Sequence, residues 1–261
     1  MFLEYAPISR RYDVPYERQQ GPNDRDGLPA LDANLEVFPR DTAQVLEYWL
    51  DVTTGEASNF VAAAVDRGIN YFDVAPFYGN AQERLGPALK PYRQNCFLAC
   101  KTLERDAAGS KKELDESLQL LQTDHFDLYQ LHALTDVEEV KEAFGPGGAM
   151  ETFLKAQKDG RIRYIGFSAH SEEAAHVALD HFDFDSVLFP LSFTAWIKGK
   201  FGPTVYERAK ESDMGILALK AMAHGNWPKG MKESERPWEK AWYEPFDEID
   251  KADLERLLHH E

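Results

Sequence analysis

Four side chains suited to proton transfer occur in order along the chain: Asp73, Tyr78, Lys101 and His132. A free tyrosine has a pKa of ~10, so acting near neutral pH requires a shift of ~3 units, or ~4 kcal/mol. One cation ~4 Å away, at an effective dielectric constant of ~20, supplies roughly that much. We therefore expect Lys101 to lower the pKa of Tyr78, with Asp73 holding the lysine. His132 would hydrogen-bond a substrate oxygen or share the proton.

This combination suits the donation of a proton to a carbonyl oxygen while another group attacks the carbon. The sequence shows no strong nucleophile, so hydride from a nicotinamide cofactor is the natural partner of the proton donor.

Short apolar runs bring three of these residues to the ends of expected strands. The runs NYFDV (70–74), CFLACK (96–101) and FDLYQLH (126–132) are each too short for a helix and follow turn residues. Because side chains alternate across a strand, Lys101 lies on the face opposite to the apolar Leu98 and Cys100. Asp73, Lys101 and His132 can then converge inside a barrel, with Tyr78 in the loop that follows the first of these strands.

The rhythm of residues 55–224 supports that arrangement. Helical patterns at residues 56–68, 110–124, 148–160, 171–181 and 204–213 alternate with strand-like runs that end near Asp73, Lys101, His132, Ser168, Pro190 and Lys220. Repeated strand–helix–strand units predict a parallel sheet of the α/β class. Six such units favour a (β/α)8 TIM-type barrel, which places its chemistry at the carboxyl ends of its strands. An open doubly wound sheet is the alternative, but its G-x-G-x-x-G turn is not found.

Two flanking regions differ from this core. Residues 1–54 are irregular, with 35–38 as the best candidate for a strand and 42–50 as a helix. Residues 225–261 form an acidic tail that carries Trp227, Trp238 and Trp242 and ends in an expected helix over 250–261. Edge-covering packing is the favoured role for the tryptophans.

Bulk composition limits the setting and the partners. The chain has 261 residues and a formal net charge of −16, which argues against nucleic acid or an anionic membrane as the main partner. It shows no signal peptide and no apolar run long enough to cross a bilayer, so we expect a cytoplasmic protein. Two cysteines, Cys96 and Cys100, form neither a disulfide framework nor a metal site. The sequence does not define the oligomeric state.

Several motifs together resemble the aldo-keto reductase family. The segment GINYFDVAPFYGNAQERLGPAL (68–89) resembles the family signature around its catalytic aspartate and tyrosine. FLACKT and DLYQLH resemble the strands that carry its lysine and histidine, DGRIRYIGFSAHS the strand whose serine meets the nicotinamide, and MGILALKAM the seventh strand. The resemblance covers about residues 55–224 and implies NADP(H)-dependent reduction of a small carbonyl substrate. It gives Asp73, Tyr78, Lys101 and His132 the tetrad roles, and Ser168 and Lys220 contacts to the cofactor.

The sequence also departs from the family pattern. The usual first strand, the eighth strand and the basic segment that grips the adenosine 2′-phosphate have no convincing counterpart. Ala169 and Leu188 stand where the family often has asparagine and glutamine. A barrel that lacks its first or last strand has open edges. Either the flanking regions or a partner covers these edges, or the sequence is a truncated or altered reading of a longer protein.

Two other functions stay open at this point. One is a non-catalytic, reductase-like protein that binds a nucleotide or a protein, which would fit the missing phosphate clamp. The other is a barrel hydrolase using Asp73 and His132, which explains neither Tyr78 nor Lys101.

Overall fold

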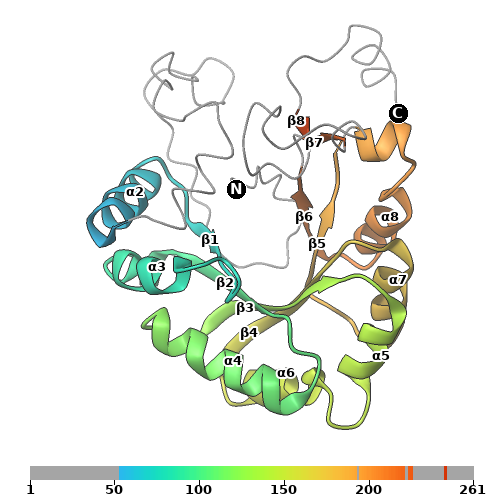
Figure 1. Ribbon diagram of the computed structural model, residues 1–261, viewed down its shortest axis with the longest axis horizontal. Helices are drawn as coiled ribbons and strands as arrows, with labels where there is room; N and C mark the ends of the chain where they lie inside the picture. Colours follow the sequence, from blue (N-terminus) through green and yellow to red (C-terminus); the bar gives the residue numbers. More distant parts are fainter. Residues whose placement is uncertain (1–52, 193, 221–222, 226–243, 246–261) are drawn as a thin grey trace, which may run out of the picture.

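A computed structural model describes residues 53–192, 194–220, 223–225 and 244–245 (Figure 1). Its strands are β1 (Tyr71–Asp73), β2 (Phe97–Thr102), β3 (Phe126–Leu134), β4 (Ile162–Ala169), β5 (Ser186–Pro190), β6 (Gly215–Leu219), β7 (Ala223–Gly225) and β8 (Glu244–Pro245). Its α-helices are α2 (Thr54–Asp66), α3 (Ala81–Leu89), α4 (Ala107–Leu120), α5 (Val137–Phe144), α6 (Ala149–Lys158), α7 (Glu172–His181) and α8 (Pro203–Glu211). Short turns of other helix types lie at Arg93–Asn95 and Thr194–Lys198.

Side-chain caps fix where the helices begin. Thr53 caps α2 in a capping box, in which its hydroxyl accepts from the backbone N–H of Glu56 and the Glu56 carboxylate accepts in return. Asp106 caps α4 by accepting from two backbone N–H groups, and Asp136 and Ser171 cap α5 and α7. Gly68 ends the first of these helices with a φ of +83°, a conformation that favours glycine.

The six main strands form one parallel sheet in the order β1-β2-β3-β4-β5-β6, with each strand paired to the next along the chain. The helices lie outside the curled sheet, and the carboxyl ends of the strands point to one side (Figure 1). This arrangement confirms the barrel-type α/β fold. In the part of the chain that the structure describes, β1 and β6 are its two edges, because β7 and β8 pair only with each other.

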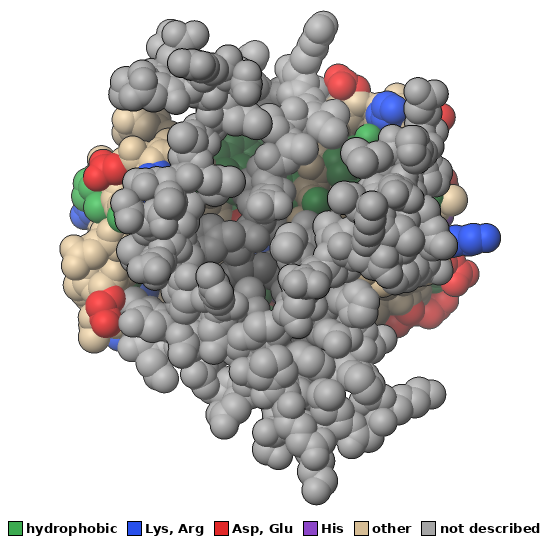
Figure 2. Space-filling model, turned by 90° about the horizontal axis from the view of Figure 1, so that it is seen from above, with side chains coloured by type: hydrophobic (Ala, Val, Ile, Leu, Met, Phe, Trp, Pro, Cys, Tyr) green, Lys and Arg blue, Asp and Glu red, His purple; other side chains and the backbone are tan. Residues whose placement is uncertain are grey.

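Side-chain alternation divides the core into two layers. Leu98 and Cys100 belong to a large cluster between sheet and helices, as predicted. A smaller cluster lies inside the curl and joins residues of all six strands: Tyr71, Phe97, Ala99, Leu128, Tyr164, Leu188, Leu217 and Leu219. Contact among side chains from β1 to β6 requires the sheet to curve around them. From above, apolar side chains are visible towards the centre, and charged ones lie at the described rim (Figure 2).

The elements differ from the sequence prediction in two places. The predicted helices over 56–68, 110–124, 148–160, 171–181 and 204–213 are present within a few residues. The sequence did not indicate α3, which contains Pro87, or α5, whose eight residues leave only Val140 and Ala143 buried. The expected strand at 35–38, the helices at 42–50 and 250–261, and the three tail tryptophans lie outside the described residues.

A buried carboxylate ties three strands together at their amino ends. Asp127, 4% exposed, accepts from the backbone N–H of Leu98 on β2 at 2.9 Å. It also pairs with Arg93 at 2.9 Å and with Arg163 of β4 at 3.1 Å. One side chain therefore fixes the register of β2, β3 and β4, the strands that carry the candidate site.

We predict that Asp127→Ala destabilises the protein by roughly 2–4 kcal/mol, because it leaves a buried N–H and a partly buried guanidinium without their partner. Denaturant unfolding measures the change. The control, Glu116→Ala, removes a 58% exposed carboxylate from a helical pair at 3.8 Å and should cost less than ~0.5 kcal/mol. Equal effects of the two substitutions would contradict the assignment.

Candidate active site

A buried ion pair lies at the carboxyl ends of the first two strands. Lys101 Nζ lies 2.5 Å from Asp73 Oδ1, and the two side chains are 0% and 8% exposed. Burial alone would lower the pKa of Lys101, but the Asp73 carboxylate and the Tyr78 phenol hold it above its ordinary value. Burial raises the pKa of Asp73 against the opposite effect of Lys101. Each partner therefore stabilises the charged form of the other against the effect of burial.

Tyr78 lies beside this pair in the loop between β1 and α3. The Lys101 ammonium is 5.2 Å from the centre of the tyrosine ring. Two backbone hydrogen bonds hold the loop: Tyr78 N–H donates to Ala75 C=O, and Ala81 N–H donates to Tyr78 C=O, both at 3.1 Å. Tyr78 as a whole residue keeps 36% of its surface exposed, while its hydroxyl is enclosed by protein next to Lys101.

The pKa of Tyr78 differs from the sequence expectation. Burial of the phenol raises the pKa above 10, outweighing the lowering effect of Lys101. The nearby Asp73 carboxylate adds to the increase. The sequence argument treated Lys101 as an isolated cation, whereas the structure presents Tyr78 with a nearly neutral ion pair.

His132 completes the group from β3. Its ring meets that of Tyr78 edge-on, with centres 5.9 Å apart. Burial, with the charges of Lys101 and Arg105, lowers its pKa to about 3. The imidazole is neutral at physiological pH and can donate or accept a hydrogen bond. Its Nδ1 is buried and has no hydrogen-bond partner in the structure.

Ser168 and Lys220, the two expected cofactor contacts, lie at the same end of the sheet. Ser168, 1% exposed, accepts a hydrogen bond from Ala133 N–H at 2.7 Å. Ala133 has a φ of +56°, so this bond holds a strained residue directly after His132. Lys220 follows β6, also with positive φ, and burial lowers its pKa.

The two departures from the family pattern occupy opposite faces. Leu188 pairs in register with Ser168 and belongs to the inner cluster. Ala169 belongs to the layer between sheet and helices.

The sequence analysis did not single out two polar residues close to the candidate site, Arg105 and His170. Arg105 is 8% exposed and donates to the backbone C=O of His132 at 2.7 Å, which fixes the end of β3. His170 follows β4; burial and the charge of Lys220 lower its pKa to about 4. An arginine in a loop carries no pattern that separates it from solvated ones. His170 could have been found from its place two residues after Ser168.

The described residues show no group of three or more metal-binding side chains. Within the same ranges, every helix is too short or too polar to span a membrane.

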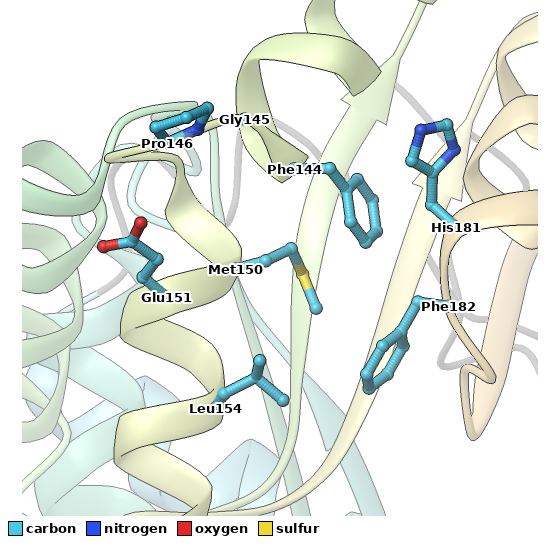
Figure 3. Close-up of a pocket in the computed structure, with 8 residues that line it drawn as sticks. All are labelled: Phe144, Gly145, Pro146, Met150, Glu151, Leu154, His181 and Phe182. Atoms are coloured by element: carbon cyan, nitrogen blue, oxygen red, sulfur yellow. The ribbon is translucent and has the colours of Figure 1, made fainter.

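A hollow of about 470 Å³ lies away from the site, between α5, α6 and α7 (Figure 3). Phe144, Met150 and Phe182 point into it. Its two titratable groups are already engaged, since Glu151 accepts from Gly147 N–H at 2.8 Å and His181 Nδ1 lies 2.8 Å from Val177 C=O. The candidate residues lie at the strand ends and not in this hollow.

Together these features define a β/α-barrel protein with a candidate site at the carboxyl ends of its strands. The aldo/keto reductase family model matches residues 42–255. The chain belongs to this family, as its motifs indicated.

The chain aligns with only part of the length of its known relatives. The aldo-keto reductase YhdN of Bacillus subtilis is 38% identical over 130 residues, 43% of this chain and 37% of that protein. The chain spans about two fifths of the curated relatives that it matches first.

Two solved structures share the fold. One assigned to the aldo-keto reductases of Pseudomonas aeruginosa is 26% identical, with a TM-score of 0.59 over 69% of this chain and 72% of that one. An aldo/keto reductase from Klebsiella pneumoniae, solved with NADP and acetate, is 20% identical with a TM-score of 0.53 over 64% and 59% of the two chains.

We predict that acid weakens this end of the barrel through its neutral histidines. Their pKa values of about 3 (His132) and about 4 (His170) lie below the ordinary 6.5. Below pH ~6.5 the unfolded chain therefore binds more protons at these two histidines than the folded chain does. The free energy of unfolding should fall between pH 6.5 and about 4, by up to ~1.4 kcal/mol per pH unit and histidine.

Denaturant unfolding at several pH values measures this slope. His132→Asn should reduce the slope of the free energy of unfolding against pH by the contribution of one histidine. His181→Asn, at the exposed end of α7, should leave that slope unchanged. An unchanged slope in the His132 variant would show that its imidazole is not held neutral.

Proposed function

We propose that the protein reduces an aldehyde or ketone to an alcohol, and catalyses the reverse reaction, with NADP(H). The observation that carries the proposal is the grouping of Tyr78, the buried Lys101–Asp73 pair and His132 at one mouth of the barrel. Membership of the aldo/keto reductase family supports the same reaction class.

Tyr78 is the proton donor in this proposal. Its raised pKa keeps the phenol protonated at neutral pH, which is the state that reduction requires. As the carbonyl oxygen gains negative charge and takes the proton, charge moves to the phenol oxygen. The ammonium of Lys101 stabilises that charge, and Asp73 keeps the ammonium in place.

His132 orients the carbonyl. As a neutral imidazole it can donate one hydrogen bond to the substrate oxygen without competing with Tyr78 for the proton. Arg105 holds the backbone of His132, and the bond from Ala133 N–H to Ser168 holds the next residue. The ring is thereby positioned from both sides.

The described residues fit the nicotinamide end of a cofactor. Ser168 offers a buried hydroxyl whose proton is free to be donated, and Leu188 beside it offers an apolar surface. Lys220 supplies a positive charge at the same end, suited to a phosphate. The reduced nicotinamide, when bound, supplies hydride to the carbonyl carbon.

The test is oxidation of NADPH by the purified full chain with a panel of aldehydes and ketones. Tyr78→Phe should lower kcat by about 10²–10⁴-fold, because it removes the proton donor and leaves the ring. The control, Tyr206→Phe on the outer helix α8, should retain wild-type kcat. Full activity in the Tyr78 variant would disprove the assignment, and tight NADPH binding without any turnover would favour the non-catalytic alternative.

The two directions of the reaction should respond differently to pH. Alcohol oxidation needs the deprotonated phenol, and the pKa of Tyr78 lies above 10. Oxidation should therefore rise with pH up to at least ~10, whereas reduction should stay nearly constant between about pH 6 and 9. Initial rates in both directions measure this. An oxidation rate that levels off near pH 7 would show that Lys101 lowers the Tyr78 pKa as the sequence first suggested.

A further inference from the structure

One inward-facing row of the sheet is polar. The register pairs Lys101 with Gln130, Gln130 with Gly166, and Gly166 with Ser186 across β2, β3, β4 and β5. Inner-cluster residues lie two positions away on these strands, such as Ala99 before Lys101 and Leu128 before Gln130. Since side chains alternate, the row points into the barrel interior, just below the mouth.

Two members of this row are buried without a hydrogen bond to any residue that the structure describes. Gln130 is 0% exposed, and neither its Oε1 nor its Nε2 has a partner; Ser186 is 0% exposed, and its Oγ has none. A glutamine amide offers two donors and an acceptor, and each one left unsatisfied in a protein interior costs about 1–3 kcal/mol. Such groups are normally satisfied by an ordered water that makes two to four hydrogen bonds.

Gly166 brings these groups near each other. A Cβ built on Gly166 would lie 2.3 Å from Ser186 Oγ. Gly166 separates Ser186 from Gln130 in the row, and the Ser186 hydroxyl occupies the space where a side chain at position 166 would begin. Any larger residue at position 166 would fill that place, and a Cβ there would also lie 2.9 Å from the Ser186 backbone oxygen.

Lys101 has one ammonium N–H left for a further acceptor. Its ammonium carries three N–H bonds; Asp73 accepts one, and Tyr78 is hydrogen-bonded to a second. Its side chain starts from a Cα directly beside that of Gln130 and is itself fully buried.

We propose that Gln130 and Ser186 hold an ordered water molecule inside the barrel, and that this water accepts a hydrogen bond from the Lys101 ammonium. Gln130 is then a positioning residue, which acts on the proton donor through Lys101. The water site stands on the buried polar groups alone, whereas its effect on catalysis rests on the function proposed above.

The first test is a crystal structure of the full chain at a resolution that shows ordered water. We expect a water within ~3.2 Å of the Gln130 amide, Ser186 Oγ and Lys101 Nζ, and its loss in Gln130→Met, which keeps the side-chain length. Direct protein partners for the Gln130 amide, or no water at the site, would overturn the proposal. This test needs no enzyme activity, so it stands even if no carbonyl is reduced.

The second test is the pH profile of alcohol oxidation. Loss of the water removes the acceptor that holds the ammonium beside Tyr78, so a less firmly held cation stabilises the phenolate less and the rising limb moves up by about one pH unit in Gln130→Met. Ser186→Ala, which deletes a single oxygen, should move it in the same direction by less, and it covers the case that the methionine variant does not fold.

The matched control is Gln82→Met on α3. Gln82 is also buried, but it donates to Ser117 Oγ at 2.8 Å on the helix side of the sheet. Its replacement should lower stability and leave the pH profile in place. A wild-type enzyme that turns over carbonyls while both Gln130→Met and Ser186→Ala keep its profile would refute the inference without affecting the proposed function.

Discussion

The buried ion pair between Lys101 and Asp73 is the constraint on which the site depends. Taking two charges out of water is expensive, and removing either partner would leave the other charge buried alone. The pair bridges β1 and β2, and β1 is a three-residue edge strand. The pair therefore sets both the electrostatics at Tyr78 and the position of the strand whose following loop carries it. A structural role and the proposed catalytic one are combined in the same two side chains.

The sequence was most informative where a single physical rule determined the outcome. Alternation along a strand placed Lys101 inside the barrel and Leu98 outside it, and the two layers of the core have that composition. Short apolar runs located all six strands. The order of residue types along these strands was enough to indicate the family.

The sequence failed where several effects compete. It gave the right neighbour for Tyr78 and the wrong direction for its pKa, because burial and the Asp73 carboxylate together outweigh Lys101. Helix α3 contains Pro87, a poor helix former that is tolerated here in the last turn of a nine-residue segment. Helix α5 is different, because Asp136 caps it and its apolar residues share one face; it was missed because it is only eight residues long. For the Tyr78 pKa and for Pro87, the deciding term is a tertiary environment that no local pattern encodes.

The edges of the sheet determine how much of a barrel the site requires. The four grouped residues belong to β1, β2, β3 and the loop after β1, and these three strands pair directly with one another. The proposed proton donor therefore needs only this half of the curl. The expected cofactor contacts come from β4 and from the residue after β6, the far edge strand in the described residues. The proposed proton-donating end and the proposed cofactor end therefore each lie beside an edge of the described sheet, since Asp73 belongs to β1 and Lys220 follows β6.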